Sequence, residues 1–277
     1  MSKIDKKTFY DLLAPYTVEL KDFIQLDNTP FRLNAFNGVY APAKAGKTYF
    51  VLEQLNKLDK ELYQIVWLDG DRNSELKDKF ENINHFPLGN PSDTLKMLIA
   101  TEYSYDDYIF IIDSFKDFTF GLDTDGNSSC QSIFNLYQQL LNKGATMVII
   151  FHATKYRDYG EVKGFKVKGN EDTIESKMDF LYKLERTDEY TKLTVQCARD
   201  IKMKIGQEFI FCDRTILKEK IRNIISSKEE ISLRDLKRES GISTYGSIVD
   251  EFIGILFNVV EVKPTGRGKP KKVVKLI

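Results

Sequence analysis

The stretch FNGVYAPAKAGKTYFVLEQL, residues 36–55, combines three local patterns in one short run. Residues 36–40 alternate as in a short strand, residues 41–46 are small and prone to turns, and Lys47 opens an amphipathic run. The stretch therefore predicts a strand, a tight loop and a helix in direct succession. Because the first backbone N–H groups of a helix lack partners within the helix, such a junction is suited to binding an anion.

Lys47 and Thr48 give this junction the chemistry of a nucleoside triphosphate site. In the pattern GxxxxGK[ST], loop N–H groups wrap the phosphates, the lysine neutralises the β/γ oxygens, and the hydroxyl ligates Mg²⁺. Here the first glycine is replaced by Ala41, which the loop tolerates if its φ stays negative. A lysine-rich helix start after a surface loop is the structural alternative. The predicted nucleotide-binding residues are Ala41, Pro42, Ala43, Lys44, Ala45, Gly46, Lys47, Thr48 and Tyr49.

Carboxylates follow two further apolar runs. The run YIFIIDSF, residues 108–115, reads as a central strand that ends in Asp113, which can hold Mg²⁺ or its water. The run YQIVWLDGDRNS, residues 63–74, ends in Asp69 and Asp71. A carboxylate here can orient the attacking water in ATP hydrolysis, and an acidic turn that caps the next element is the alternative.

One more buried strand is expected in ATMVIIFHATK, residues 145–155, and it leads into His152. Strands thus alternate with helices, which predicts an α/β fold with a doubly wound, mostly parallel sheet and its ligand at the carboxyl ends of the strands. His152 at such an end can sense the γ-phosphate or be purely structural. The other histidine, His85, is interpreted as structural and without partners.

The order of these motifs resembles that of the RecA/DnaB-type ATPases, and within them the RepA-type plasmid replicative helicases and similar small phage or plasmid ATPases. The resemblance spans residues 25–213 and includes FHATK followed by VKGNEDTIESKMDFLYKLER. It implies a RecA-like, Mg²⁺- and ATP-dependent enzyme that binds single-stranded DNA and assembles with copies of itself, most plausibly as a hexameric ring.

The resemblance also implies roles for single residues. Lys47 and Thr48 match the phosphate lysine and the Mg²⁺ hydroxyl, and Asp113 matches the Walker B aspartate. Asp71 matches the catalytic glutamate but is one methylene shorter. His152 matches the strand-tip sensor. Cations that act at a neighbour's ATP are expected in residues 196–209, where a solvated edge strand is the alternative; they are Arg199, Lys202 and Lys204.

A basic segment, residues 155–168, carries five cations interleaved with aromatic residues. Cations can follow phosphates while aromatic rings stack on bases, as in grooves for single strands. The family resemblance places a DNA-facing loop here, and a solvated surface hairpin is the alternative. The residues predicted to bind DNA in this segment are Lys155, Arg157, Lys163, Phe165, Lys166 and Lys168.

The C-terminal residues 214–277 differ from the rest in charge. They hold fourteen Lys and Arg against eight Asp and Glu, a surplus of +6 in a chain of zero net charge. Three helical segments followed by two strands around PTGRGKPKK resemble a winged helix-turn-helix domain. Such a domain binds duplex DNA or protein, and its predicted DNA contacts are Tyr245, Arg267, Lys269, Lys271 and Lys272.

Two domains are therefore predicted, residues 1–213 with an N-terminal arm over residues 1–30, and residues 214–277. No apolar run approaches 18 residues, the N-terminus lacks an apolar signal core, and the three cysteines share no metal spacing. A soluble, cytoplasmic protein is expected. Composition alone does not point to a nucleic acid partner.

The sequence predicts a DNA motor of the helicase kind. Two alternatives remain open. One is a RecA-like recombination or strand-annealing ATPase that forms filaments or rings without unwinding. The other is a DNA-binding initiator or regulator that ATP switches, which the shorter Asp71 side chain favours because binding without rapid turnover suits a switch.

Overall fold

The structure is a computed structural model that describes residues 5, 7–8, 22–76, 78–159, 161–187, 190–212, 214–228, 230–240, 247–262 and 271–277. The described strands are β1 (Ile24–Gln25), β2 (Arg32–Leu33), β3 (Phe36–Ala41), β4 (Gln64–Asp69), β5 (Ile83–Pro87), β6 (Tyr108–Asp113), β7 (Thr146–Asp158), β8 (Glu161–Val167), β9 (Phe180–Arg186), β10 (Tyr190–Ala198), β11 (Glu208–Cys212), β12 (Phe257–Val262) and β13 (Lys271–Leu276). The α-helices are α2 (Lys47–Leu55), α3 (Pro91–Ala100), α4 (Asn127–Asn142), α5 (Glu171–Lys177), α6 (Arg214–Ser226) and α7 (Leu233–Glu239), and the 3₁₀ helices are η2 (Ser74–Leu76), η3 (Phe115–Phe118) and η4 (Ser247–Phe252).

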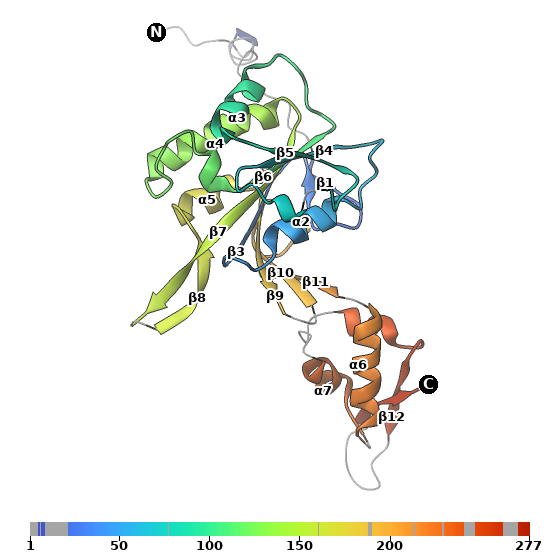
Figure 1. Ribbon diagram of the computed structural model, residues 1–277. Coiled ribbons are helices and arrows are strands. Elements are labelled where there is room, and N and C mark those ends of the chain that lie inside the picture. Colours follow the sequence, from blue (N-terminus) through green and yellow to red (C-terminus); the bar gives the residue numbers. More distant parts are fainter. Residues whose placement is uncertain are drawn as a thin grey trace. The chain divides into compact units, whose positions relative to one another are not determined.

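Nine strands form the central sheet in the order β11-β10-β9-β3-β7-β6-β4-β5, with β8 paired to β7 outside this path (Figure 1). Strands β5, β4, β6 and β7 pair in parallel. The edge strands β9, β10 and β11 pair antiparallel. The predicted α/β class with a central, mostly parallel sheet is confirmed.

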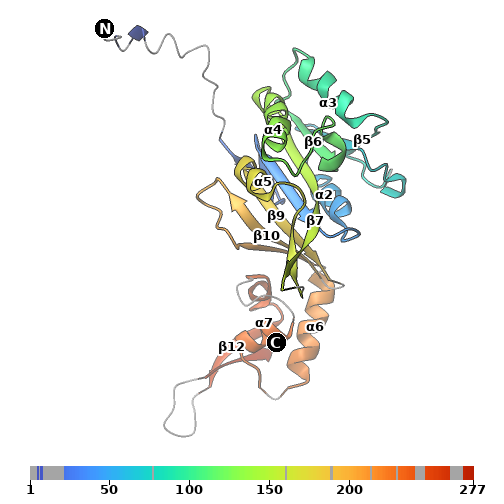
Figure 2. The ribbon, with the colours of Figure 1, turned by 90° about the vertical axis from the view of Figure 1, so that its left-hand side faces the viewer.

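Helices cover both faces of the parallel strands, as the handedness of their connections requires. The chain moves outward from β3 to β4 through α2, then returns toward β3 through α3, α4 and α5. Because right-handed crossovers in opposite directions lie on opposite faces, α2 covers one face and the other three helices cover the other (Figure 2). Contacts of α4 with α3 and α5 agree with this arrangement.

Continuous apolar runs place the core in the parallel strands. Every residue of β3, the last five of β6 and the first six of β7 are buried. An aromatic cluster fixes the segment that follows β6, because the Phe115 ring stacks on Phe134 and lies 4.8 Å from the Phe151 ring, centroid to centroid. Phe115 belongs to η3, so this packing holds the residues next to Asp113 in place.

Backbone contacts divide the chain into two compact units. The first contains the described residues of 1–38, 48–151 and 168–179, and the second those of 39–47, 152–167 and 180–277. The predicted domain boundary at residues 213/214 stays a prediction. Most of the predicted N-terminal arm lies outside the described residues. In the described part of the arm, residues 24–25 form β1, which pairs with β2.

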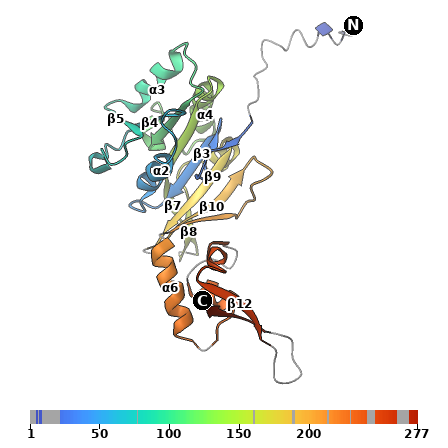
Figure 3. The same cartoon turned by 90° about the vertical axis from the view of Figure 1, so that its right-hand side faces the viewer.

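The C-terminal segment has its own small core. Helices α6 and α7, η4 and the antiparallel pair β12–β13 contribute apolar side chains to one cluster. Figure 3 shows the ribbons of α6 and β12 in this segment. Ile231 forms a backbone bridge with Val274, and Ser232 caps α7 by accepting a hydrogen bond from the Asp235 N–H at 3.1 Å. Ile255 follows the end of η4 at Phe252 and is 67% exposed.

Within the described residues, no helix is long and apolar enough to cross a membrane.

Candidate functional site

The predicted phosphate loop connects β3 directly to α2. Lys44 and Gly46 adopt positive φ, 62° and 77°, and the Ala45 N–H donates to the Pro42 carbonyl at 3.3 Å. Ala41 is fully buried and is not among the described residues with positive φ. The replacement of the first glycine by Ala41 is therefore compatible with this backbone, because strain from a side chain arises only where φ is positive.

Lys47 closes the loop on itself. Its Nζ donates to the carbonyls of Ala41 at 3.1 Å and Pro42 at 3.0 Å, and the residue is only 7% exposed. The ammonium group thus lies at the loop rather than extending into solvent. A lysine drawn onto a tight loop at a helix N-terminus fits a group with several phosphates, since cation, N–H groups and helix dipole all favour negative charge.

We expect Ala41→Gly to change nucleotide affinity by less than about twofold and to lower the free energy of unfolding by about 0.5–1 kcal/mol, because glycine loses more backbone entropy on folding. Urea unfolding and nucleotide titration of both proteins measure these effects. An affinity gain of tenfold or more would contradict the prediction, since it would mean that the Ala41 side chain strains the loop.

Asp113 is the centre of a buried polar cluster in the first unit. The Thr48 hydroxyl lies 3.1 Å from Asp113 Oδ2, and the same oxygen accepts hydrogen bonds from Trp67 Nε1 and Asn73 Nδ2, both at 3.2 Å. Burial raises the pKa of Asp113 to about 7, and the charges of Asp71 and Asp69 add to the shift. A bound cation would therefore stabilise the ionised form of Asp113.

Strand register brings the second carboxylate to the same place. Asp69 pairs with Asp113 across the parallel strands β4 and β6. Asp69 is fully buried, and its Oδ2 accepts from the Asn73 N–H at 2.7 Å and lies 2.9 Å from His85 Nε2. The His85 ring also stacks on Trp67 at 4.1 Å between centroids. The interpretation of His85 as a residue without partners is therefore wrong, because β5 pairs beside β4.

Asp71 lies beyond the end of β4 and forms an ion pair with Lys116, with 2.7 Å between Oδ1 and Nζ. Lys116 belongs to η3, and the pKa of Lys116 is raised chiefly by its hydrogen bond to Asp71. The Ser114 hydroxyl donates to Asp117 Oδ2 at 3.0 Å in the same turn. Asp71, the predicted water-orienting carboxylate, is close enough to Asp113 to raise its pKa. Asp71 itself is paired with Lys116.

Thr48 and Asp113 fit a magnesium ion. Among the described residues, no group of three or more His, Cys, Asp and Glu could hold a metal ion by itself. Mg²⁺ in nucleotide sites needs only one or two protein oxygens, since phosphates and waters complete its shell. A hydroxyl in contact with a buried carboxylate, one residue after the loop lysine, supplies this donor set.

Two further sets of predicted site residues lie on β7 and in the turn after β10. His152 comes two residues after the last β7 residue that pairs with β6, although β7 itself continues to Asp158, and its role as a sensor stays a prediction. Parallel pairing with β6 does end at Ile150, opposite Asp113, because β7 then pairs with β8. The predicted trans-acting cations Arg199, Lys202 and Lys204 follow β10 in an exposed turn before β11.

Most of the segment 155–168 lies in paired strands, β7 up to Asp158 and β8 from Glu161 to Val167, which is the hairpin backbone that the sequence left open as the alternative. The register pairs Lys155 with Phe165, and Arg157 follows on the same face of β7. Lys166 pairs with Thr154 on the opposite face, Lys163 lies in the bulge opposite residues 156–157 with an ion pair to Glu161, and Lys168 lies beyond β8. The predicted DNA-binding side chains therefore divide between two faces of the hairpin.

Two of the five predicted C-terminal contacts, Lys271 and Lys272, lie within the described residues. Tyr245, Arg267 and Lys269 lie outside the described residues. Lys271 begins β13, and Lys272 is exposed on the same strand.

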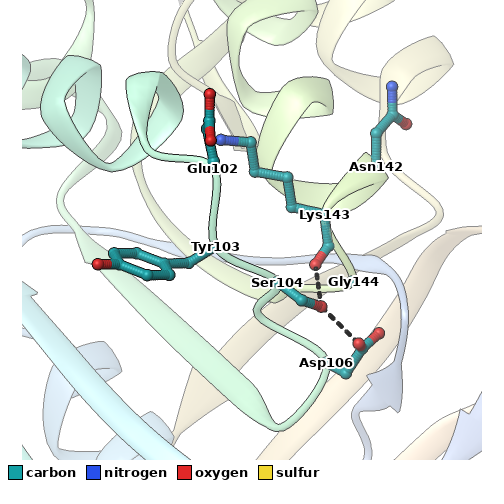
Figure 4. A pocket seen from close by; sticks show the side chains of 7 residues that line it. All are labelled: Glu102, Tyr103, Ser104, Asp106, Asn142, Lys143 and Gly144. Atoms are coloured by element: carbon teal, nitrogen blue, oxygen red, sulfur yellow. Dashed lines mark hydrogen bonds between the residues drawn. The ribbon is translucent and has the colours of Figure 1, made fainter.

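A polar pocket of about 370 Å³ lies at the amino ends of β6 and β7 (Figure 4). Ser104 and Lys143, two of its lining residues, precede β6 and β7, whereas Asp113 ends β6. Ser104 Oγ donates to Asp106 Oδ2, and Lys143 Nζ donates to the Ile99 carbonyl, each at 2.5 Å. Ser104 Oγ also lies 3.2 Å from the Lys143 carbonyl, which joins the turn before β6 to the turn before β7. The pocket therefore lies at the amino ends of these strands, whereas Asp113 lies at the carboxyl end of β6.

Sequence reasoning missed several members of the Asp113 cluster: Trp67, Asn73, His85 and Lys116. Two signals were available. Trp67 and Asp69 lie two residues apart on β4 and so share a face, and Asn73 follows the strand within one short turn. No local signal pointed to His85 or Lys116, because their contacts depend on which strands are neighbours.

Comparison with known proteins gives a distant structural likeness. No protein-family model matches the chain, and no match was found among curated proteins. Among solved structures, the crystal structure of the RadB recombinase aligns with a TM-score of 0.46 and 12% sequence identity, over 65% of this chain and 87% of that chain.

Proposed function

We propose that the chain is a Mg²⁺-dependent ATPase with a RecA-like domain that acts on DNA, working as a ring-forming replicative helicase. One observation carries the ATPase proposal. Lys47 is drawn onto a loop with the phosphate-binding pattern, and the next residue, Thr48, contacts the buried carboxylate of Asp113. Loop, cation, hydroxyl and acid are the parts that nucleoside triphosphate hydrolysis requires.

Each residue then has a defined task. Lys47 leaves its loop carbonyls to neutralise the β/γ oxygens, and Thr48 and Asp113 hold the Mg²⁺ ion. When bound, the metal offsets the charge that develops on the transferred phosphoryl group. Asp71 orients the attacking water once it separates from Lys116. Arg199, Lys202 and Lys204, in an exposed turn, contribute positive charge to the site of an adjacent subunit.

Steady-state ATP hydrolysis tests this proposal, measured with Mg²⁺ alone, with single-stranded DNA and with duplex DNA. Strong stimulation by single strands supports a motor, and unwinding of a forked substrate then distinguishes a helicase from a recombinase. Electron microscopy with ATP and single-stranded DNA separates closed rings from filaments. Absence of ATP binding would refute the proposal.

A second candidate function is an ATP-dependent switch, in which nucleotide binding controls assembly on DNA and turnover is slow. The ion pair between Asp71 and Lys116 favours it, because a carboxylate held by a cation is a weaker partner for water. Tight ATP binding with negligible hydrolysis on any DNA would support the switch over the motor.

The β7–β8 hairpin is proposed to contact single-stranded DNA through the face that carries Lys155, Arg157 and Phe165. We expect the double variant Lys155→Ala/Arg157→Ala to weaken DNA binding and to reduce the slope of log K against log salt by about 1.4, since each phosphate contact contributes about 0.7 on single strands. Fluorescence anisotropy over a salt series measures the slope.

The control for this variant is Lys60→Ala/Lys79→Ala, which removes the same charge from two exposed positions outside the hairpin. It should leave the slope within about 0.3 of the wild-type value. Equal slopes for both double variants would contradict the assignment of DNA contacts to the hairpin.

The C-terminal segment is proposed to be a winged helix-turn-helix domain that binds duplex DNA. The order of its described elements, the Ile231–Val274 bridge and its apolar cluster support this proposal. A surplus of positive charge in residues 214–277 favours nucleic acid. Duplex binding that survives deletion of these residues would exclude this role.

A further inference from the structure

Arg186 lies against the phosphate loop although 140 residues separate it from Gly46 in sequence. A Cβ atom built on Gly46 would lie 2.6 Å from Arg186 Nη1 and 3.6 Å from its Cζ. The guanidinium group is therefore packed beside the backbone of Gly46. Both residues belong to the second unit, so this contact lies within one compact body.

The position of Arg186 follows from its strand. It is the last residue of β9, which neighbours β3 in the sheet. At the beginning of both strands the Asp179 N–H donates to the Phe36 carbonyl at 3.2 Å, so β9 runs alongside β3 in the same direction and ends beside the loop. Arg186 thus reaches Gly46 because β9 is one of the two strands that flank β3.

Ion pairs on the other face of the sheet hold this strand end in register. Glu185 contacts Lys183 and Lys192, each at 2.9 Å, and Lys192 also contacts Glu208 of β11. Since successive side chains alternate across a strand, Glu185 and Arg186 point to opposite faces. Glu185 therefore lies with these lysines on one face of the sheet, and Arg186 lies on the other.

Arginine at this position has a specific chemistry. A planar guanidinium can donate two parallel hydrogen bonds to phosphate oxygens. Backbone N–H groups of a GxxxxGK[ST] loop hold the α- and β-phosphates, while the lysine reaches the β- and γ-phosphates. A cation next to Gly46 is therefore closest to the phosphates that ATP and ADP share.

We propose that Arg186 is a second cation of the nucleotide site, acting from the same chain as the phosphate loop and binding the α/β-phosphates of nucleoside di- and triphosphates. This inference rests on the proposed ATPase function. Because ADP and ATP present the same phosphates to Arg186, it stabilises ground and transition states alike and sets affinity rather than turnover. Its role thus differs from that proposed for Arg199, which acts on an adjacent subunit.

Isothermal titration calorimetry with Mg²⁺–ADP and with a non-hydrolysable Mg²⁺–ATP analogue tests the inference on the full chain. We expect Arg186→Ala to raise the Kd for both nucleotides by the same factor of about ten or more, the size of a lost charge-assisted hydrogen bond. The KM for ATP should rise similarly while kcat stays within about twofold. Arg186→Lys should restore part of the affinity.

Two further proteins make the outcomes distinguishable. Arg222→Ala, at an exposed position on α6, should bind nucleotide as the wild type does. Lys47→Ala should bind weakly. Normal binding by Arg186→Ala alongside weak binding by Lys47→Ala would overturn the role of Arg186 alone. A loss confined to the ATP analogue, with a lower kcat, would also overturn it, since Arg186 would then act on the terminal phosphate. No difference between wild type and Lys47→Ala would overturn the proposed ATPase function itself.

Discussion

Lys47→Ala should reduce kcat/KM for ATP hydrolysis by on the order of a hundredfold or more. The change removes the ammonium group that lies at the phosphate loop, where it donates to the carbonyls of Ala41 and Pro42. The loss combines weaker nucleotide binding with weaker stabilisation of the developing phosphate charge. Hydrolysis at the normal rate would refute the site assignment and with it the proposed function.

The fold should survive this change. Lys47 donates to the carbonyls of Ala41 and Pro42, and losing a buried hydrogen-bond partner costs about 1–3 kcal/mol, which the lower desolvation cost of alanine offsets in part. The chain has a single tryptophan, and Trp67 donates to Asp113, so its fluorescence reports both unfolding and Mg²⁺–nucleotide binding. Lys60→Ala, an exposed change, is the matched control.

Asp113→Asn should abolish Mg²⁺-dependent hydrolysis and yet stabilise the nucleotide-free protein. The pKa of Asp113 is raised from an ordinary 3.8 to about 7, chiefly by burial. Between these two values the folded chain binds the proton more tightly than the unfolded chain, so stability falls as pH rises from about 4 to about 7 and stays lower above that. Asparagine carries no charge at any pH and still accepts hydrogen bonds from Thr48, Trp67 and Asn73.

The expected gain in the free energy of unfolding at pH 8 is on the order of 2–4 kcal/mol, with little gain at pH 4. Urea unfolding of both proteins at the two pH values, followed by Trp67 fluorescence, measures it. Asp107→Asn, an exposed carboxylate just before the same strand, should show no such pH-dependent gain. Equal stability of wild type and Asp113→Asn at pH 8 would mean that the buried carboxylate is ionised without cost.

Together these two variants separate binding chemistry from folding. Lys47 donates to two loop carbonyls and contributes positive charge for a bound anion, so its loss should harm activity more than stability. Asp113 contributes negative charge that the empty fold tolerates poorly, so its loss improves stability while activity disappears. A buried acid of this kind is a typical exchange of stability for function.

Several elements were predictable because their signals are local. The phosphate loop needs only a strand, a run of small residues and a helix start, all within residues 36–55. The positions of Asp113 and Asp69 were predictable because each ends a short apolar run, and the carboxyl ends of parallel strands meet at the same end of a sheet. The C-terminal strands around PTGRGKPKK were likewise predicted from composition, and β12 and β13 confirm them.

Other features could not be predicted from a pattern that had two structural solutions. For residues 155–168 the sequence left a DNA-facing loop and a surface hairpin open, because polar alternation suits both, and the pairing of β7 with β8 gives the hairpin backbone. The isolated appearance of His85 in sequence hid its bond to Asp69, which exists only because β5 and β4 are neighbours.

The sequence by itself determined the loop, the acids at the strand ends and the α/β class, since periodicity, turn chemistry and helix starts act over a few residues. Only the tertiary structure decided which distant side chains surround those groups. Strand order placed His85 against Asp69, η3 packing brought Lys116 to Asp71, and the pairing of β9 beside β3 carried Arg186 to Gly46. Such contacts depend on how the whole sheet packs, and no local stretch of sequence encodes them.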